Sequence, residues 1–205
     1  MSMNDLSVKA FAEELAAKVS VPGGGGAAAL VGALAAALGS MVGVFTVGKP
    51  KYQAVEEDIK ALLDKAEKLR IELLNCIDED AVGFEPLSRA YNIPKDEPGR
   101  DETLEKCLRD AASVPMKITE LSCQVIELQK EFAEKGSTLM ISDAGCGAVL
   151  AWAAMYAAVL NVRVNTKLMK DRAYAEEMNA RTDELMNKYW KVADQVYESV
   201  FEKLK

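Results

Sequence analysis

Asp80 is the residue of this sequence whose position points most directly to chemistry. In the helix predicted over 52–91, apolar residues recur every three or four positions, and Asp80 falls on their stripe, three residues after Ile77 and four before Phe84. Burial disfavours the charged form of an aspartate, and a carboxyl group with a perturbed pKa is a candidate general acid or base. A buried salt bridge, or a helix-kink partner near Pro86, is the structural alternative. The apolar members of the stripe are Leu62, Ala66, Leu69, Leu73, Ile77, Phe84, Leu87 and Tyr91.

Four consecutive glycines, Gly23, Gly24, Gly25 and Gly26, lie at the start of a second predicted helix, over 25–47. Free backbone N–H groups and the positive end of the helix dipole at such a start could hold an anionic or carbonyl-rich ligand. A tight turn or a close helix crossing would explain the same glycines without a ligand. No GKS or GKT follows and no strand precedes, which excludes a P-loop and a Rossmann fingerprint.

Two further polar groups are candidates for binding. Lys49 and Lys51 lie in the segment GKPKY after the glycine-rich helix, where a short cationic loop could hold carboxylates. Ser142 and Asp143, in ISDAG, precede a long apolar run. Solvent-exposed lysines are the simpler interpretation of the first pair, and capping of the following helix is the simpler interpretation of the second.

Composition excludes several classes of function. The 205 residues contain no histidine, which removes Ser-His-Asp and Cys-His nucleophiles, HExxH zinc sites and Glu-x-x-His di-iron bundles. The net charge of −7, with both signs interspersed, argues against nucleic acid or an anionic membrane surface as the main partner. Four scattered cysteines without a CxxC pair, and a start that lacks a signal-peptide pattern, indicate a reducing cytoplasm.

Helices must position these candidate residues, because Ala, Leu, Glu, Lys and Met dominate at helical spacing and alternating β-patterns are nearly absent. We predict an all-α fold, a single multihelical bundle of about six helices in one domain over residues 1–205. Pro86 and Pro115 are expected to kink or interrupt the third and fourth helices. The predicted helices cover 5–19, 25–47, 52–91, 101–134, 143–168 and 170–203.

Two predicted helices are apolar on all sides. The chain carries no charge from Ser20 through Gly48, and the stretch 144–162 is similarly uncharged. The first of these segments is long enough to span a bilayer, but its content of mainly Ala and Gly makes insertion weak. Central helices of an assembly fit better, so we expect a homodimer or higher symmetric oligomer that dimerises through these helices. Close backbone approach is expected at Gly32, Ala36, Gly39 and Gly43.

Five sequence blocks in this order resemble the formiminotetrahydrofolate cyclodeaminase and methenyltetrahydrofolate cyclohydrolase family, between about Pro22 and Asn165. The resemblance implies an all-helical dimer that binds tetrahydrofolate, needs no metal, and acts on the one-carbon unit between N5 and N10. No permanently bound cofactor is expected, since the tetrahydrofolate derivative is the substrate. The blocks are PGGGGAAALVGALAAALGSMVGVFTVGKPKY, DEDAVGF, AASVP, ISDAG and LNVRVN.

The resemblance assigns roles to individual positions. The family's catalytic aspartate matches Asp80, its glycine-rich turn matches Gly23 to Gly26, and its serine-aspartate pair matches Ser142 and Asp143. We expect Asp143 to bind the pterin ring, and Lys49 and Lys51 to bind the glutamate carboxylates. The chain departs from the family where three alanines follow Gly26 instead of a GGGS pattern. It departs again where Gly136-Ser137 replaces a Gly-Asn pair.

Two reactions are compatible with these blocks. The chain lacks the formiminotransferase half of the fused enzymes, and its GGGGAAA and DRAYAEE stretches resemble stand-alone cyclohydrolases more closely. We therefore expect hydrolysis of 5,10-methenyltetrahydrofolate to 10-formyltetrahydrofolate. Formiminotetrahydrofolate cyclodeaminase, which releases ammonia, is the alternative reaction. A non-catalytic helical interaction protein, with the uncharged helices as its interface and Asp80 as a structural residue, is the alternative of a different class.

Overall fold

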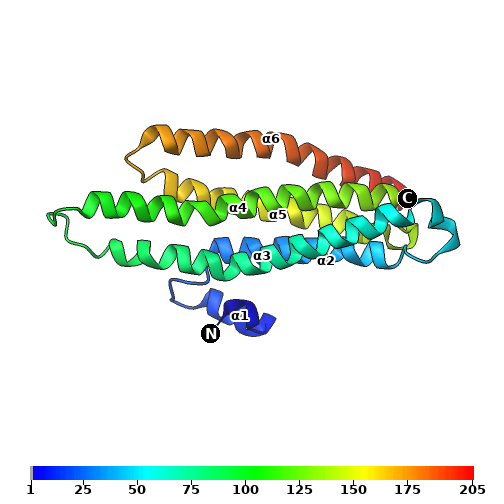
Figure 1. Ribbon diagram of the computed structural model, residues 1–205, viewed down its shortest axis with the longest axis horizontal. Helices are drawn as coiled ribbons and strands as arrows, with labels where there is room; N and C mark the ends of the chain where they lie inside the picture. Colours follow the sequence, from blue (N-terminus) through cyan, green and yellow to red (C-terminus); the bar gives the residue numbers. More distant parts are fainter. Residues whose placement is uncertain (1) are drawn as a thin grey trace.

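Six α-helices make up most of the protein, and the computed structural model describes residues 2–205 (Figure 1). Over those residues the chain contains no strand, which confirms the all-α prediction. Short 3₁₀ helices cover Met3–Asp5, Pro50–Val55 and Thr138–Met140. The α-helices are α1 (Val8–Ala16), α2 (Gly24–Val44), α3 (Glu56–Ala90), α4 (Arg100–Lys135), α5 (Ile141–Thr166) and α6 (Arg172–Lys203).

The helix ends differ from the prediction where local chemistry sets them. The first helix is shorter than the predicted 5–19, because the Ser7 hydroxyl caps it by accepting a hydrogen bond from the N–H of Ala10. Asp171 caps α6 in the same way, through the N–H of Tyr174. The expected interruptions are absent: α3 continues through Pro86, and α4 continues through the buried Pro115. Packing against neighbouring helices supports these long helices despite the lost hydrogen bonds.

The five long helices lie lengthwise beside one another, and α1 packs outside them (Figure 1). Helix α2 contacts α3 and α5, while α5 contacts α2 and α6, and α4 packs against both α2 and α5. Helices α2 and α5 are antiparallel, because Gly24 at the start of α2 lies against Asn161 near the end of α5. The start of α5 therefore lies at the same end of the bundle as the end of α2.

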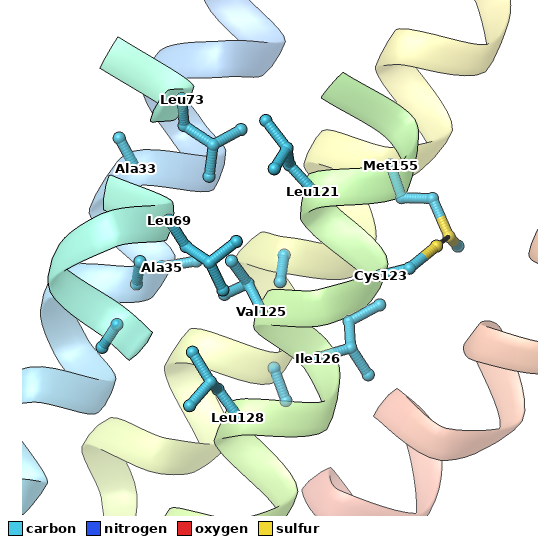
Figure 2. Packing of buried hydrophobic residues seen from close by; sticks show 14 of the residues in the cluster. Ala33, Ala35, Leu69, Leu73, Leu121, Cys123, Val125, Ile126, Leu128 and Met155 are labelled. Carbon is cyan, nitrogen blue, oxygen red and sulfur yellow. Dashed lines mark hydrogen bonds between the residues drawn. The ribbon is translucent and has the colours of Figure 1, made fainter. Parts of the chain in front are cut away.

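Small residues on α2 let large side chains of its neighbours pack closely. Ala33 and Ala35 lie opposite Leu69 and Leu73 of α3 and Val125 of α4 (Figure 2). All five residues are almost completely buried.

The glycines inside α2 are sites of close packing, as expected. The atoms that approach them are side chains of neighbouring helices, however, and not the helix backbones that the sequence analysis predicted. A Cβ atom added to Gly39 would lie 2.8 Å from Nε2 of Gln129, and one added to Gly43 would lie 2.7 Å from Cδ2 of Leu63. At Gly32 the nearest atom would be Cδ2 of Leu73, at 3.1 Å. The glycines are therefore sites into which neighbouring helices insert their side chains.

Helix α2, and the segment Thr138–Thr166 that contains α5, are long and apolar enough to cross a membrane by length and composition. Half of the most apolar window in each is buried inside the bundle. Charged residues and ion pairs line the neighbouring helices, as in the pair between Lys135 of α4 and Asp58 of α3. Burial in the centre of a helical bundle accounts for the buried half of both segments.

Candidate active site

Helix α3 places Asp80 on its buried side. Leu69, Leu73 and Ile77, which precede Asp80 on the predicted stripe, are buried, and Leu87 beyond it is fully buried. Asp80 itself is partly buried. Tyr91 is the exception on the stripe, since it is 46% exposed where α3 has already ended at Ala90.

The start of α2 holds the Asp80 carboxylate in one orientation. The N–H of Gly26 donates a hydrogen bond of 3.0 Å to Oδ2. A Cβ atom on Gly25 would lie 2.5 Å from both Cγ and Oδ2 of Asp80, and closer still to Oδ1. Only glycine leaves room at this position for the carboxylate. Two of the four predicted glycines therefore meet Asp80 directly, at the positive end of the α2 dipole.

Burial raises the pKa of Asp80, and the hydrogen bond from Gly26 partly opposes that increase. Over residues 2–205 no basic side chain forms an ion pair with Asp80. Its two preceding neighbours are engaged elsewhere. Asp78 accepts hydrogen bonds from the N–H of Met3 at 2.7 Å and from the hydroxyl of Ser2, and Glu79 pairs with Lys117 at 2.8 Å.

Asn161 of α5 completes this end of the site, and the sequence analysis did not select it. A Cβ atom on Gly24 would lie 2.9 Å from Nδ2 and 3.1 Å from Oδ1 of Asn161. The Asn161 Nδ2 group donates to the carbonyl of Ala157 at 2.8 Å. The buried Asn165 donates in turn to the carbonyls of Asn161 and Ala111. The sequence contains no periodic signal for Asn161, because a single asparagine at the end of an uncharged run has no spacing partner.

The remaining candidates lie at the other end of α2 and α5. Lys49 and Lys51 follow the end of α2, whereas Gly24 begins it, and the 21 residues of the helix span about 30 Å. Ser142 and Asp143 lie in the first turn of α5, at the same end as the two lysines. The structure therefore does not bring these four residues to Asp80 within one chain.

Capping of α5 by Ser142 or Asp143 is a wrong prediction. The helix already begins at Ile141, after Met140, because the 3₁₀ turn Thr138–Met140 leads directly into it. Both polar side chains therefore lie inside the helix rather than at its cap.

Tyr52 links the lysine loop to the segment before α5. Its hydroxyl accepts a hydrogen bond of 3.0 Å from the N–H of Thr138 and lies 3.3 Å from the Thr138 hydroxyl. These contacts lower the pKa of Tyr52 to about 8. The loop that carries Lys49 and Lys51 is thus fixed beside the start of α5.

The hollows that follow the groove between α5 and α6 are separate from this site. Their linings are mainly apolar and include Trp152, Trp190, Tyr197 and Phe201. Asp80 lines none of them. The candidate site rests on the chemistry of Asp80, which can act as a base or stabilise a cation beside the start of α2.

The chain is similar to several known proteins. A sequence model described as formiminotransferase-cyclodeaminase matches residues 7–184. A methenyltetrahydrofolate cyclohydrolase of Methylorubrum extorquens is 39% identical over 202 residues, which are 97% of each chain. A formimidoyltransferase-cyclodeaminase of Rattus norvegicus is 33% identical over 90% of this chain, which spans only 35% of that protein's length. The crystal structure of formiminotetrahydrofolate cyclodeaminase from Thermotoga maritima superposes with a TM-score of 0.83 at 28% identity, covering 98% of this chain and 96% of that one.

Proposed function

The chain belongs to the formiminotransferase-cyclodeaminase family, and from this premise we propose that it hydrolyses 5,10-methenyltetrahydrofolate to 10-formyltetrahydrofolate. The observation that carries the choice of reaction is the 39% identity to a cyclohydrolase that matches this chain along 97% of both lengths. The partly buried carboxylate of Asp80 supports the same chemistry.

The substrate presents a cationic amidinium carbon between N5 and N10. Asp80 stabilises this cation, orients a water molecule, and takes one proton from it as the water oxygen bonds to carbon. The N–H of Gly26 donates to Oδ2 at 3.0 Å and so fixes the orientation of the carboxylate that takes the proton. Because burial raises the pKa of Asp80, the carboxylate is a stronger base than a solvent-exposed aspartate.

Collapse of the tetrahedral adduct completes the reaction. The bond between carbon and N5 breaks, and the protonated Asp80 returns its proton to N5. The hydroxyl proton of the adduct leaves to solvent as the formyl carbonyl forms on N10. The sum is one water consumed and one proton released, with Asp80 again a carboxylate.

Binding of the rest of the folate is assigned by chemical complementarity. Gly23 to Gly26 provide the turn that meets the reacting part of the ligand, with Asp80 beside them. Ser142 and Asp143 are chemically suited to the pterin's amino and ring N–H groups, but within one chain they lie at the end of the bundle opposite Asp80. Lys49 and Lys51 are suited to the glutamate carboxylates.

Formiminotetrahydrofolate cyclodeaminase activity is the second candidate. The observation that favours it is the similarity to the Thermotoga maritima cyclodeaminase, with a TM-score of 0.83 over nearly the whole chain. In that reaction the same aspartic acid protonates the departing amine as the methenyl ring closes.

The assembly and location complete the proposal. We propose a cytoplasmic homodimer that uses no permanently bound cofactor or metal and has neither nucleic acid nor a membrane as a partner. Four free cysteines, of which Cys146 is exposed, support a reducing compartment. The apolar outer sides of α2 and α5 support the dimer.

Parallel turnover tests the proposal. The purified protein is given methenyltetrahydrofolate while its absorbance is followed, and formiminotetrahydrofolate while ammonia is followed, with Asp80→Asn as the blank for spontaneous reaction. Loss of absorbance above that blank without ammonia supports the cyclohydrolase, whereas ammonia release supports the cyclodeaminase. Silence in both assays, together with no folate-dependent rise in melting temperature, would favour the non-catalytic interaction protein.

A further inference from the structure

Asn161 and Asp80 approach two neighbouring residues at the start of α2, from two different helices. A Cβ atom on Gly24 would lie 2.9 Å from Nδ2 and 3.1 Å from Oδ1 of Asn161, on α5. A Cβ atom on Gly25 would lie 2.5 Å from Cγ of Asp80, on α3. Consecutive Cα atoms are about 3.8 Å apart, and consecutive side-chain directions on a helix differ by about 100°. The amide and the carboxylate therefore flank the same helix start.

Open space adjoins these two side chains. Neither Asn161 nor Asp80 is fully buried, and Gly24, which Asn161 contacts, is exposed. A Cβ atom on Gly23, the residue before it, would meet no atom within 4 Å. A small ligand beside Gly23 and Gly24 thus has access to both the amide and the carboxylate.

One hydrogen bond fixes which way the Asn161 amide faces. Its Nδ2 donates to the carbonyl of Ala157 at 2.8 Å. If the amide nitrogen and oxygen were exchanged, two acceptor oxygens would lie at this distance, so the exchanged orientation is disfavoured. Over residues 2–205 no donor lies within hydrogen-bonding distance of Oδ1. Oδ1 is therefore an acceptor of known orientation that is available to a ligand.

The backbone that carries this amide is also held in place. The buried Asn165 donates through Nδ2 to the carbonyl of Asn161 at 2.9 Å and to the carbonyl of Ala111 at 3.2 Å. Because Ala111 belongs to α4, this side chain ties the last turns of α5 to the neighbouring helix. The Asn161 amide is thus a pre-organised group, which loses little freedom when it binds a ligand.

The charged groups around this part of the site already have partners. Glu79 pairs with Lys117 at 2.8 Å, and Arg163, two residues after Asn161, pairs with Asp183. The carboxylate on α3 and the amide oxygen on α5 are left as two acceptors beside the open space. Two acceptors on either side of a small gap are suited to a ligand with two O–H or N–H donors, such as water.

We propose that Asn161 positions the water molecule that attacks the one-carbon unit, by accepting one of its two hydrogen bonds through Oδ1 while Asp80 accepts the other. The inference rests on the proposed function, since the water belongs to that reaction. Asp80 takes one proton as the water oxygen bonds to carbon. The second hydrogen stays on the hydroxyl of the adduct, where Asn161 holds it until the bond to N5 breaks. Asn161 is neutral and takes no proton, so one water is still consumed and one proton released.

An amide suits the second acceptor position better than a carboxylate. A water that donates both hydrogens points its lone pairs away from the two acceptors, so the amide aims the oxygen without competing for the proton. A second negative charge beside Asp80 would instead raise the pKa of Asp80 further and leave the base protonated.

The kinetics of Asn161→Ala separate positioning of water from binding of folate. We expect kcat for methenyltetrahydrofolate to fall at least about tenfold, because the water is no longer aimed at the carbon. KM should change less than about twofold, because Oδ1 contacts the water rather than the folate. Asn92→Ala is the matched control and should keep the wild-type kcat. Asn92 is exposed just after α3, and its Nδ2 donates to the carbonyl of Ser88, the same bond to the fourth preceding residue.

Asn161→Asp gives a second readout, which does not depend on the size of that loss. Its carboxylate would lie beside Asp80 and raise the pKa of Asp80, so the acid limb of kcat/KM should move to higher pH by at least about half a pH unit. Asn92→Asp is the control for the added charge. It lies a dozen residues beyond Asp80, or about 18 Å along the helix direction, which exceeds the screening length of about 10 Å at 0.1 M salt. The control should leave the acid limb in place.

The alternative outcomes are distinct. An unchanged kcat in a folded Asn161→Ala, or an unchanged acid limb in Asn161→Asp, would overturn the inference. A raised KM with a wild-type kcat would overturn it as well, because Asn161 would then bind the folate itself. If Asp80→Asn abolishes turnover while the Asn161 variants behave like the wild type, this inference alone is wrong. If the wild type turns over neither folate substrate, the proposed function fails and takes this inference with it.

Discussion

At the scale of single residues, Asp80 is subject to two opposing influences. Burial on the inner side of α3 raises the pKa of its carboxyl group, while the hydrogen bond from the N–H of Gly26 stabilises the charged form. Burial is the larger influence. The protein therefore retains at this position a group that costs stability when it is ionised, which is expected of a residue kept for chemistry.

Asp80→Asn should remove activity without damaging the fold. The asparagine Oδ1 can still accept the hydrogen bond from Gly26, but the amide cannot take a proton from water. We expect turnover of methenyltetrahydrofolate to fall by about 10²- to 10⁴-fold, the usual contribution of general acid–base catalysis. Stopped-flow absorbance measures the rate, and circular dichroism checks the helices. Full activity in a normally folded variant would contradict the catalytic role.

The same variant should change how stability depends on pH. The folded-state pKa of Asp80 is raised, so the wild-type protein is most stable while this group is protonated and loses that stability as pH rises through the folded pKa. The Asn variant lacks this dependence. Its melting temperature should equal or exceed that of the wild type at pH 7, and the difference should shrink as pH falls through the folded pKa of Asp80. A lower melting temperature at pH 7 would indicate a structural role.

Gly25→Ala should displace the catalytic carboxylate. The new Cβ would lie 2.5 Å from Cγ of Asp80, so the side chain must move, and a displacement of about 1 Å can cost roughly 10²-fold in rate. Gly23→Ala is the matched comparison, because a Cβ there meets no atom within 4 Å. We expect Gly23→Ala to retain at least about tenfold more turnover than Gly25→Ala. Equal losses in the two variants would show that the clash with Asp80 is not the cause.

Which site residues could be predicted depended on whether periodicity exposed them. Asp80 interrupts an otherwise apolar helical stripe, so its burial could be predicted from spacing alone. Asn161 could not, since one asparagine in an apolar run has no spacing partner, and its contact with Gly24 exists only once α2 and α5 are packed. The capping role expected for Ser142 failed because a preceding 3₁₀ turn moves the helix start to Ile141.

At the scale of the helices, Gln129 of α4 is wedged between α2 and α5. Its side chain is fully buried, and its Nε2 donates a hydrogen bond of 2.7 Å to the carbonyl of Ala35. Glycines on both neighbours make room for it, because Cβ atoms on Gly39 and Gly147 would lie within 2.8 Å of its amide. A polar side chain thus fixes the separation of the two apolar helices.

Gly147→Ala should destabilise this packing. The added Cβ would lie 2.5 Å from Cδ of Gln129, and overpacking of this kind typically costs about 1–3 kcal/mol of unfolding free energy. Gly83→Ala is the control of opposite sign: its Cβ would meet the carbonyl oxygen of Asp110 at an ordinary 3.6 Å, and alanine in a helix interior gains about 0.5–1 kcal/mol over glycine. Urea unfolding measures both. Similar changes in the free energy of unfolding of the two variants would contradict the role of Gln129 in fixing the separation of α2 and α5.

The number and order of the helices could be predicted because helix-forming residues fill the predicted helices and Gly or Pro residues fall between them along the whole chain. The effect of the internal prolines could not, since Pro115 is tolerated through contacts that α4 makes with other helices. Local sequence describes the missing hydrogen bond but not the packing that compensates for it.

At the scale of the whole molecule, the two uncharged helices have two different surroundings. Their inner sides form the core with α3, α4 and α6, while their outer sides leave apolar residues such as Leu34 and Leu160 exposed. The sequence predicted that some of this apolar surface would face another subunit, because one bundle of this size does not need two helices that are apolar all round. It could not predict that the candidate binding groups would lie at opposite ends of that surface, since the direction of α5 relative to α2 is set by packing.

Leu34→Glu tests the proposed homodimer, in which the exposed apolar sides of α2 and α5 hold two copies together. Leu34 lies in the middle of α2 and is 50% exposed, so a glutamate there should leave the single chain folded but bury an unpaired charge at the interface. We expect the dissociation constant of the dimer to rise at least about 100-fold, or about 2.7 kcal/mol. Ile71→Glu is the matched control, since Ile71 is 45% exposed and lies on α3, outside the apolar surface of α2 and α5. Light scattering coupled to size-exclusion chromatography should find Leu34→Glu monomeric and Ile71→Glu dimeric. A dimeric Leu34→Glu would place the interface elsewhere.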